Sequence, residues 1–437
     1  MGDILGSLFA LLATGAMTGL VQRGLPGAQR QLIWIGFVMH AVAAFAQLWL
    51  ILTVYGGVGD TLSFFREGDL LARWLERDLI GRFPDLLSLL FHGYPRLPFL
   101  IQGIGQSTGA MSGLGSILLL LLDSRWAGNL LIGQLAFLGQ VQIFLSLRRL
   151  TPPQVHLRLG LAILLLPSVV FWSAGLTKEG VALIGLGALF QGISRFFEGE
   201  RRMGAVFLAL GVLIIGLFKA YILFPWVIAL GVWIYWRRAV SGGRTVQIRP
   251  ARLILAAAIG WAGIVLLGEL FPKFAIDNLG EQMAQQQVYG RAVQGGSSYS
   301  VGDPTQRGLL GQLAFAPLGL VASLFRPFLF EARSLVQLVN ALETALLMFL
   351  LGAGLYRHGW RGFIGRIFRS PLLMFCLTFV LLFGTAVGIS TTNLGTLSRY
   401  RLPMMPFYAL LLLLLDFRDA PAPSPIRSRA LGPAEAG

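Results

Sequence analysis

The sequence predicts an all-α, polytopic integral membrane protein built as a bundle of about 11 to 13 spanning helices. Of the 437 residues, 55% are hydrophobic and only 13% are charged, and the mean hydropathy is +0.72. A soluble domain of this length cannot bury so much apolar surface. Apolar runs of membrane length also recur along the whole chain, and the connections between them alternate in charge.

The apolar runs define the predicted spans, because each crossing needs about 20 largely apolar residues. They lie near residues 4–21, 31–55, 129–147, 158–175, 179–194, 203–218, 220–236, 252–271, 334–355, 371–390 and 402–416. Residues 1–417 are therefore predicted to form one transmembrane helical domain. Residues 418–437 are rich in Pro, Ala and Ser, which predicts a disordered tail on the cytoplasmic side.

The positive charge is concentrated in every second connection. The formal net charge of +15 comes largely from arginines in four connections, namely Arg148, Arg149 and Arg158, then Arg195, Arg201 and Arg202, then Arg237, Arg238, Arg244, Arg249 and Arg252, and last Arg357, Arg361, Arg366 and Arg369. This alternation is the positive-inside pattern, which places these connections in the cytoplasm next to membrane lipids. It explains the charge without a nucleic-acid partner. Asp3 precedes the first span and Arg23 and Arg30 follow it, so the N-terminus is predicted outside.

Two connections on the predicted outer face, 56–128 and 272–333, are too long to be simple turns. In the first, leucines spaced as on a helix oppose charged residues around 66–80, which predicts a helix lying in the membrane interface. The stretch 99–122 is apolar, but its first half carries glutamines and glycines, and a crossing there would disturb the charge alternation. We interpret it as re-entrant or interfacial, with a full span as the open alternative.

The second outer connection contains a Gln-, Gly- and Ser-rich stretch at 281–308, which predicts a mobile loop. Such a loop can act as a lid over a site or as an inert linker, and both roles stay open. The following stretch 308–325 is apolar and interrupted by Pro317, which predicts a broken helix on or in the outer leaflet. This helix leads directly to Arg326 and Glu331.

Several kinds of chemistry lack their sequence signals. Cys376 is the only cysteine, which excludes disulfides within the chain and cysteine-based zinc or redox sites. The histidines, which are His40, His92, His156 and His358, show no metal-ligand spacing. The chain also contains no P-loop, GxSxG or HExxH motif. No metal site is predicted, and among cofactors only a divalent cation is left open.

Three polar islands mark the predicted functional face: FWSAGLTKEG at 171–180, LFRPFLFEAR at 324–333 and NLGTLSRYR at 393–401. Charge at the end of a membrane span is costly unless it has a function. Asp60, which follows GGVG after the second run, adds a carboxylate at the same face. It can accept a proton from a hydroxyl group, or it can serve as a helix N-cap, and the two roles are compatible.

The charged residues of the islands suit phosphate binding, with a structural alternative for each. Lys178 either contacts a phosphate or pairs with the neighbouring Glu179. Arg326, Arg399 and Arg401 carry guanidinium groups, which bind phosphate through two parallel hydrogen bonds. For Arg399 and Arg401, the alternative is that the long side chain only carries its charge to the membrane surface. The predicted phosphate-binding residues are Lys178, Glu179, Arg326, Glu331, Arg399 and Arg401, with Asp60 as the catalytic base.

The order of these motifs resembles that of bacterial multispanning proteins related to the GT-C superfamily of glycosyltransferases. The GD motif at 59–60 is followed by PSVVFWSAGLTKEG, LFRPFLFEARSLVQLVNALE and NLGTLSRYRLPMMPFYALLLLL, and the resemblance covers most of residues 50–416. The layout is similar to that of family 39 mannosyltransferases and of O-antigen and exopolysaccharide polymerases. Many such enzymes have a pair of acidic residues in the first outer loop. In this chain Asp60 is the only acidic residue directly after the second apolar run.

The resemblance implies a GT-C-like fold in the cytoplasmic membrane of a bacterium, with the active cavity on the outer face. It implies a sugar donor linked to polyprenyl phosphate and a glycan or lipid acceptor. Asp60 matches the acidic residue of the first loop, and Arg399 and Arg401 match an Arg-rich helix start near the donor phosphate. A flippase for lipid-linked glycans or a secondary transporter is the alternative from another class, for which ionisable groups near the membrane midplane and repeated halves are expected.

Overall fold

The structure is a computed structural model of the chain. It describes residues 2–241, 265, 268–269, 276–292, 299, 301–303, 305–306 and 308–416. Within these ranges every regular element is a helix, and there is no strand. This confirms the predicted all-α class. The predicted span at 252–271 falls outside the described residues except for 265, 268 and 269, and the predicted tail at 418–437 falls outside them entirely.

The predicted apolar runs coincide with helices wherever the structure describes them. The helices concerned are α1 (Gly2–Val21), α2 (Gly27–Thr53), α6 (Arg125–Leu150), α7 (His156–Leu164) with α8 (Pro167–Ser173), α9 (Lys178–Phe197), α10 (Arg201–Lys219), α11 (Leu223–Ser241), α16 (Leu335–Arg369), α17 (Pro371–Ser390) and α19 (Met405–Leu413). Among the described residues, seven helical stretches are long and apolar enough to cross a membrane, or eight if the pair bent by 47° at residues 164–167 counts as one. The chain is thus a multi-pass helical membrane protein.

One of the seven stretches, Arg201–Val240, turns back on itself. Helix α10 ends at Lys219, where the backbone leaves the helical region (φ −150°), and a short 3₁₀ turn leads into α11. Gly204, near the start of α10, packs against Phe196, and Arg237, near the end of α11, stacks over Phe197. A straight helix would hold these positions about 50 Å apart. The stretch therefore contributes two antiparallel crossings, in agreement with the predicted runs.

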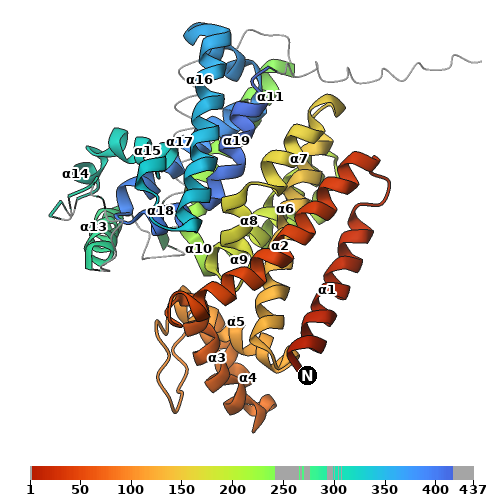
Figure 1. Ribbon diagram of the computed structural model, residues 1–437, viewed down its shortest axis with the longest axis vertical. Coiled ribbons are helices and arrows are strands. Elements are labelled where there is room, and N and C mark those ends of the chain that lie inside the picture. The colour runs from red at the N-terminus through yellow and green to blue at the C-terminus, as the bar shows by residue number, and fades with distance from the viewer. Residues whose placement is uncertain are drawn as a thin grey trace, which may run out of the picture.

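The described parts of the basic connections gather at one end of the bundle, and Arg244, Arg249 and Arg252 lie outside the described residues. Arg148 donates to Gln29 at 2.7 Å, Arg149 pairs with Glu198 at 3.6 Å, and Arg366 donates to the Leu415 carbonyl at 3.3 Å. These contacts join connections that are far apart in the sequence. Figure 1 shows that the loops around α3, α4 and α5 lie at the opposite end, beside the N-terminus. The alternation of charge predicted from the sequence thus corresponds to the two ends of the bundle.

The first long connection folds into three helices, α3 (Asp60–Glu76), α4 (Leu79–Leu90) and α5 (Ser107–Leu122). The apolar stripe of α3 packs against α5, so that Leu71 and Leu75 are fully buried, whereas Leu70 and Ile80 are exposed. The predicted single interfacial helix over this region is therefore two helices, which break at Asp78, the side-chain cap of α4. Helix α5, at 16 residues, is shorter than a usual crossing.

The second long connection is more helical than predicted. The Gln-rich sequence that predicts a mobile loop instead forms the C-terminal part of α13 (Ile276–Ala292). Gln287 is buried and donates to Gln312 at 2.8 Å and to the Ile389 carbonyl at 3.0 Å. The prediction of a loop is therefore wrong for residues 281–292, where the helix places Gln287 among protein partners. The described residues between 299 and 307 are not helical, and residues 293–298 lie outside the described residues. The Pro-broken helix is confirmed as α14 (Leu309–Leu313) and α15 (Ala316–Phe325).

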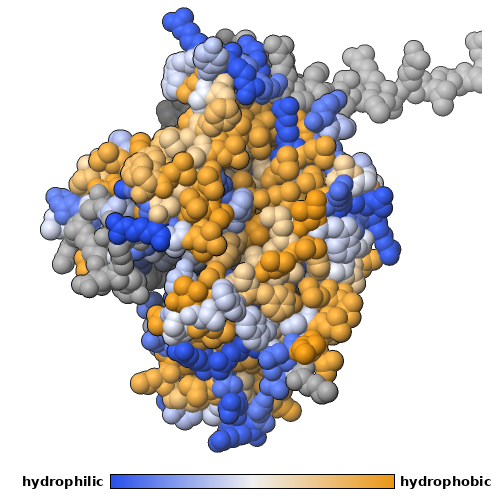
Figure 2. All heavy atoms as spheres, in the orientation of Figure 1, coloured by the Kyte–Doolittle hydropathy of each residue, from blue (hydrophilic) through white to orange (hydrophobic). Residues whose placement is uncertain are grey.

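Small residues bring the central helices close together. Helices α6 and α9 pack closely at Gly139 and Gly187. A Cβ atom on Gly139 would meet the backbone of Leu183 in α9, and one on Gly187 would meet the backbone of Gly139 in α6. Large apolar side chains of α1, α2, α10 and α16 point outward, including Leu5, Val42, Leu210 and Phe349. Figure 2 shows the resulting apolar surface, with hydrophilic side chains mainly toward the ends. This distribution is that of a protein surrounded by lipid.

Candidate functional site

The site begins at Asp60, in the first turn of α3. Gly59 occupies the N-cap position, and no side chain caps this helix. The carboxylate of Asp60 instead accepts a hydrogen bond from Arg399 Nη1 at 2.7 Å, while its side chain stays 58% exposed. The structure thus gives Asp60 a partner in another part of the chain, and it remains accessible to solvent. The capping role proposed from the sequence does not apply.

Arg399 lies on the short helix α18 (Leu394–Tyr400), whose start is fixed by the Asn393 side chain. Asn393 Oδ1 accepts from the amides of Gly395 and Thr396, which caps the helix and sets its direction. Arg399 Nε lies 2.9 Å from Glu179 Oε2, so one guanidinium group bridges two carboxylates. Burial alone would lower the pKa of Arg399, but Glu179 and Asp60 raise it above its ordinary value. The guanidinium therefore stays charged.

Glu179 is fully buried at the start of α9, where Thr177 caps the helix by accepting from the Gly180 amide. Its second oxygen accepts from Lys219 Nζ at 2.6 Å. Lys219 is buried as well, and its ammonium lies 4.5 Å from the ring centre of Tyr400. A buried carboxylate is costly unless it is paired, and Glu179 has a hydrogen bond from Lys219 on Oε1 and an ion pair with Arg399 on Oε2.

Lys178 completes the group from the other side of α9. Its Nζ donates to Ser107 Oγ at 3.0 Å and to Thr108 Oγ1 at 2.8 Å, both at the start of α5. It pairs with neither Glu179 nor another carboxylate among the described residues. An ammonium group has three N–H donors, so the two hydroxyls leave one free for a ligand. The proposed pairing of Lys178 with Glu179 is thus replaced by two separate sets of contacts.

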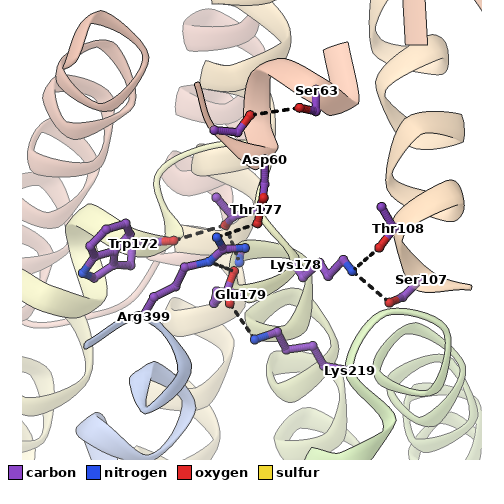
Figure 3. Close-up of polar contacts among 12 residues, drawn as sticks. Asp60, Ser63, Ser107, Thr108, Trp172, Thr177, Lys178, Glu179, Lys219 and Arg399 are labelled. Atoms are coloured by element: carbon purple, nitrogen blue, oxygen red, sulfur yellow. Dashed lines mark hydrogen bonds and ion pairs between the residues drawn. The ribbon is translucent and has the colours of Figure 1, made fainter. Parts of the chain in front are cut away.

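Figure 3 shows Asp60, Glu179, Lys219 and Arg399 converging from α3, α9, α10 and α18, while Lys178 of α9 extends away from them toward Ser107 and Thr108. We call Asp60, Lys178, Glu179, Lys219 and Arg399 the mouth cluster. It holds three cations and two carboxylates, which leaves one positive charge uncompensated. Its exposed members are a carboxylate that can accept a proton and, close to it, a partly exposed ammonium. Such a site suits an anionic ligand with a reacting hydroxyl group nearby.

Arg326, Glu331 and Arg401 form a second group. Arg326 Nε donates to Glu331 at 2.9 Å, and the guanidinium lies 4.5 Å from the ring centre of Tyr299. Arg401 is fully buried and donates to the Ser323 carbonyl at 3.0 Å and to Thr344 Oγ1 at 2.9 Å. These contacts attach the end of α18 to α15 and α16. None of the three residues contacts Asp60, so the structure does not bring them into the mouth cluster.

Sequence reasoning did not assign Lys219, Ser107 or Thr108 to the site. Lys219 carries a signal that was available, because a lone lysine between two apolar runs is costly in a membrane unless it is paired. The two hydroxyls carry no signal of their own, since Ser and Thr are common at helix starts. Among the described residues, no group of three or more His, Cys, Asp or Glu side chains is arranged to hold a metal ion.

Comparison with known proteins gives no match: no family model, no curated protein and no solved structure is significantly similar to the chain.

Proposed function

We propose that the protein is a membrane glycosyltransferase, in cell-envelope or exopolysaccharide synthesis. It transfers a sugar or oligosaccharide from a polyprenyl-phosphate-linked donor to a glycan or lipid acceptor. The observation that carries the proposal is the mouth cluster, in which the exposed carboxylate of Asp60 lies beside Arg399 and near the incompletely bonded ammonium of Lys178. A transferase of this kind needs a proton acceptor for the hydroxyl and cations for the phosphate.

The reaction follows from these roles. Asp60 takes the proton of the acceptor hydroxyl, whose oxygen forms a bond to the anomeric carbon of the donor sugar. The bond from that carbon to the phosphate oxygen breaks, and the leaving phosphate keeps the bonding electrons. Lys178 and Arg399 stabilise the negative charge that develops on this oxygen. Glu179 and Lys219 keep Arg399 in place, since both are buried and bonded to each other.

The proposal places the mouth cluster on the outer face of the cytoplasmic membrane of a bacterium. The N-terminus is then outside and the C-terminus is in the cytoplasm. Support comes from the basic connections, which gather at the end of the bundle opposite α3–α5.

Substitution of Asp60 tests the proposal. In a strain that lacks this chain, lipid-linked intermediates should accumulate, and the wild-type chain should remove them. Asp60→Asn keeps the size of the side chain and removes the proton acceptor, so glycan transfer should fall by roughly two to four orders of magnitude at matched protein levels. Asp69→Asn, which also removes an Arg-paired carboxylate from α3, is the matched control and should behave as wild type. Wild-type output from Asp60→Asn would contradict the proposal.

Transport of a lipid-linked glycan is the second candidate, and one observation favours it. Glu343, buried within α16, accepts from the backbone amide of Ser168 at 2.7 Å and from its hydroxyl at 2.5 Å, next to the bend between α7 and α8. Buried carboxylates beside broken helices occur in secondary transporters. The location of the accumulated intermediate separates the two functions. An impermeant glycosidase should digest it if transfer is blocked, whereas an intermediate held on the cytoplasmic leaflet would favour a flippase.

A further inference from the structure

The C-terminal part of α16 differs from its spanning part. At Gly359 the backbone leaves the helical region (φ 61°, ψ 167°), so residues 360–369 turn away from the helix that precedes them. Glycine allows this turn because it has no Cβ atom. One face of the turned segment packs on the bundle: Phe363 and Ile367 are buried, and the Phe368 carbonyl accepts from Trp236 Nε1 at 2.9 Å. The segment is therefore held firmly at the basic end.

Exposed aromatic rings lie on both sides of the Gly359 turn. Tyr356, before the turn, is 92% exposed, and Trp360, directly after it, is 70% exposed, whereas Phe368 is 40% exposed and its ring packs edge-on against Trp236. Fully exposed aromatic rings are unfavourable in water, but Trp and Tyr are enriched where the apolar core of a membrane meets the headgroups. Figure 2 shows hydrophilic side chains at this end of α16 and apolar surface next to them. The position of the rings therefore fits the boundary between lipid and water.

Two exposed arginines, Arg361 and Arg369, lie near these rings and have no ion-pair partner among the described residues. Arg357 pairs with Asp416 at 3.1 Å, and Arg366 donates to the Leu415 carbonyl at 3.3 Å. Arg361 and Arg369, in contrast, make no ion pair within the part of the chain that the structure describes. This end of α16 thus combines unpaired positive charge with aromatic rings that suit a membrane boundary.

We propose that residues 356–369 form a binding surface for anionic phospholipid headgroups. Arg361 and Arg369 contact the lipid phosphates, and Tyr356 and Trp360 enter the boundary between the headgroups and the acyl chains. Attraction to an anionic surface requires cations that are not neutralised internally, and among the described residues these two arginines have no carboxylate partner. The surface belongs to the basic end of the bundle, away from the mouth cluster, so the proposal does not depend on the proposed function.

Lipid selectivity of the whole protein tests this surface. The full chain is reconstituted in phosphatidylcholine vesicles that contain spin-labelled phosphatidylglycerol or spin-labelled phosphatidylcholine, and the immobilised fraction of each label is measured. Wild type should prefer phosphatidylglycerol. The double substitution Arg361→Gln and Arg369→Gln should weaken that preference by about fivefold for each arginine removed. Arg361→Lys with Arg369→Lys keeps both charges and should retain most of it.

Arg201→Gln with Arg202→Gln is the matched control, because it removes two exposed arginines from another connection at the same end. This control should keep most of the preference if residues 356–369 form the binding surface. An equal loss in the control would show that the attraction is a property of the whole basic end and would overturn the proposal. Absence of any preference in the wild type would overturn it as well. Circular dichroism of each variant verifies that the helices are intact.

Discussion

Arg399 Nη1 donates to Asp60 Oδ2 at 2.7 Å and joins residues that are 339 positions apart in the chain. The same guanidinium lies 2.9 Å from the buried Glu179, which in turn accepts from Lys219 at 2.6 Å. An exposed carboxylate at the mouth is thereby connected through Arg399 to charges inside the bundle. Changes to the buried members should therefore act on both stability and the geometry of Asp60.

Glu179→Gln should be strongly destabilising. The substitution leaves Lys219 buried without a carboxylate, and removal of one partner of a buried pair costs about 3 to 5 kcal/mol. Arg399 is less affected because it keeps Asp60. The free energy of unfolding in detergent, measured with a denaturant, should fall by that amount, whereas Glu198→Gln, whose partner Arg149 is partly exposed, should change it by less than about 1 kcal/mol.

The double variant Glu179→Gln with Lys219→Met separates charge from packing. It removes the unpaired ammonium and keeps a long apolar side chain, so most of the stability that Glu179→Gln loses should return. If the double variant is instead as unstable as the sum of both single variants, the pair is not coupled as the structure indicates.

Arg401→Lys should affect folding rather than substrate binding. The lysine side chain cannot reproduce the donor geometry with which Arg401 satisfies the Ser323 carbonyl and Thr344 Oγ1, and an unsatisfied buried polar group costs about 1 to 3 kcal/mol. The melting temperature in detergent should fall, while KM for the donor should stay unchanged. Arg357→Lys, at an exposed arginine, should alter neither. A raised KM at an unchanged melting temperature would assign Arg401 to the donor site.

Stability should decrease in mildly acidic solution because of His92. Burial chiefly lowers the pKa of His92 below its ordinary value of 6.5, and its Nε2 lies 2.7 Å from the Leu217 carbonyl. The unfolded chain therefore takes up a proton first as the pH falls, so this contribution is present above about pH 6.5 and is lost below it. The drop in melting temperature between pH 7.5 and 5.5 should be smaller in His92→Gln, and equal drops would contradict the assignment.

The spanning helices could be predicted from the sequence because their signal is local. A run such as 179–194 must bury its backbone groups in a helix to cross a membrane, whatever the rest of the chain does. Gln287 shows where the approach fails. A polar stretch predicts solvent exposure, but the amide of Gln287 has buried partners at Gln312 and Ile389, which belong to other helices. Such contacts depend on tertiary packing and leave no local pattern.

The site was predictable in part for the same reason. Charge at the end of a span is costly, which identifies Lys178, Glu179 and Arg399 as residues that require partners. Which partners they take depends on helix positions. Arg399 and Arg401 are two positions apart in one polar island, yet the first reaches Asp60 and the second is buried against α15 and α16. No sequence pattern separates them, because their directions are set by α18 and the turn that follows.

Labelling of single cysteines tests the proposed orientation. Cys376 is buried and can be replaced by serine, which provides a background without reactive thiols. Glu76, at the end of α3, and Arg201, at the start of α10, are exposed at opposite ends of the bundle. In intact cells an impermeant maleimide should label Glu76→Cys and leave Arg201→Cys unlabelled, because the basic connections face the cytoplasm.

Permeabilisation of the membrane should make Arg201→Cys reactive and leave the labelling of Glu76→Cys unchanged, which verifies that both thiols are accessible. The reverse result, with Arg201→Cys labelled in intact cells, would place the mouth cluster in the cytoplasm. In that case Asp60 would lie on the side where soluble nucleotide-activated sugars are available, and the need for a polyprenyl-linked donor would disappear. The orientation therefore decides which class of donor the site can use.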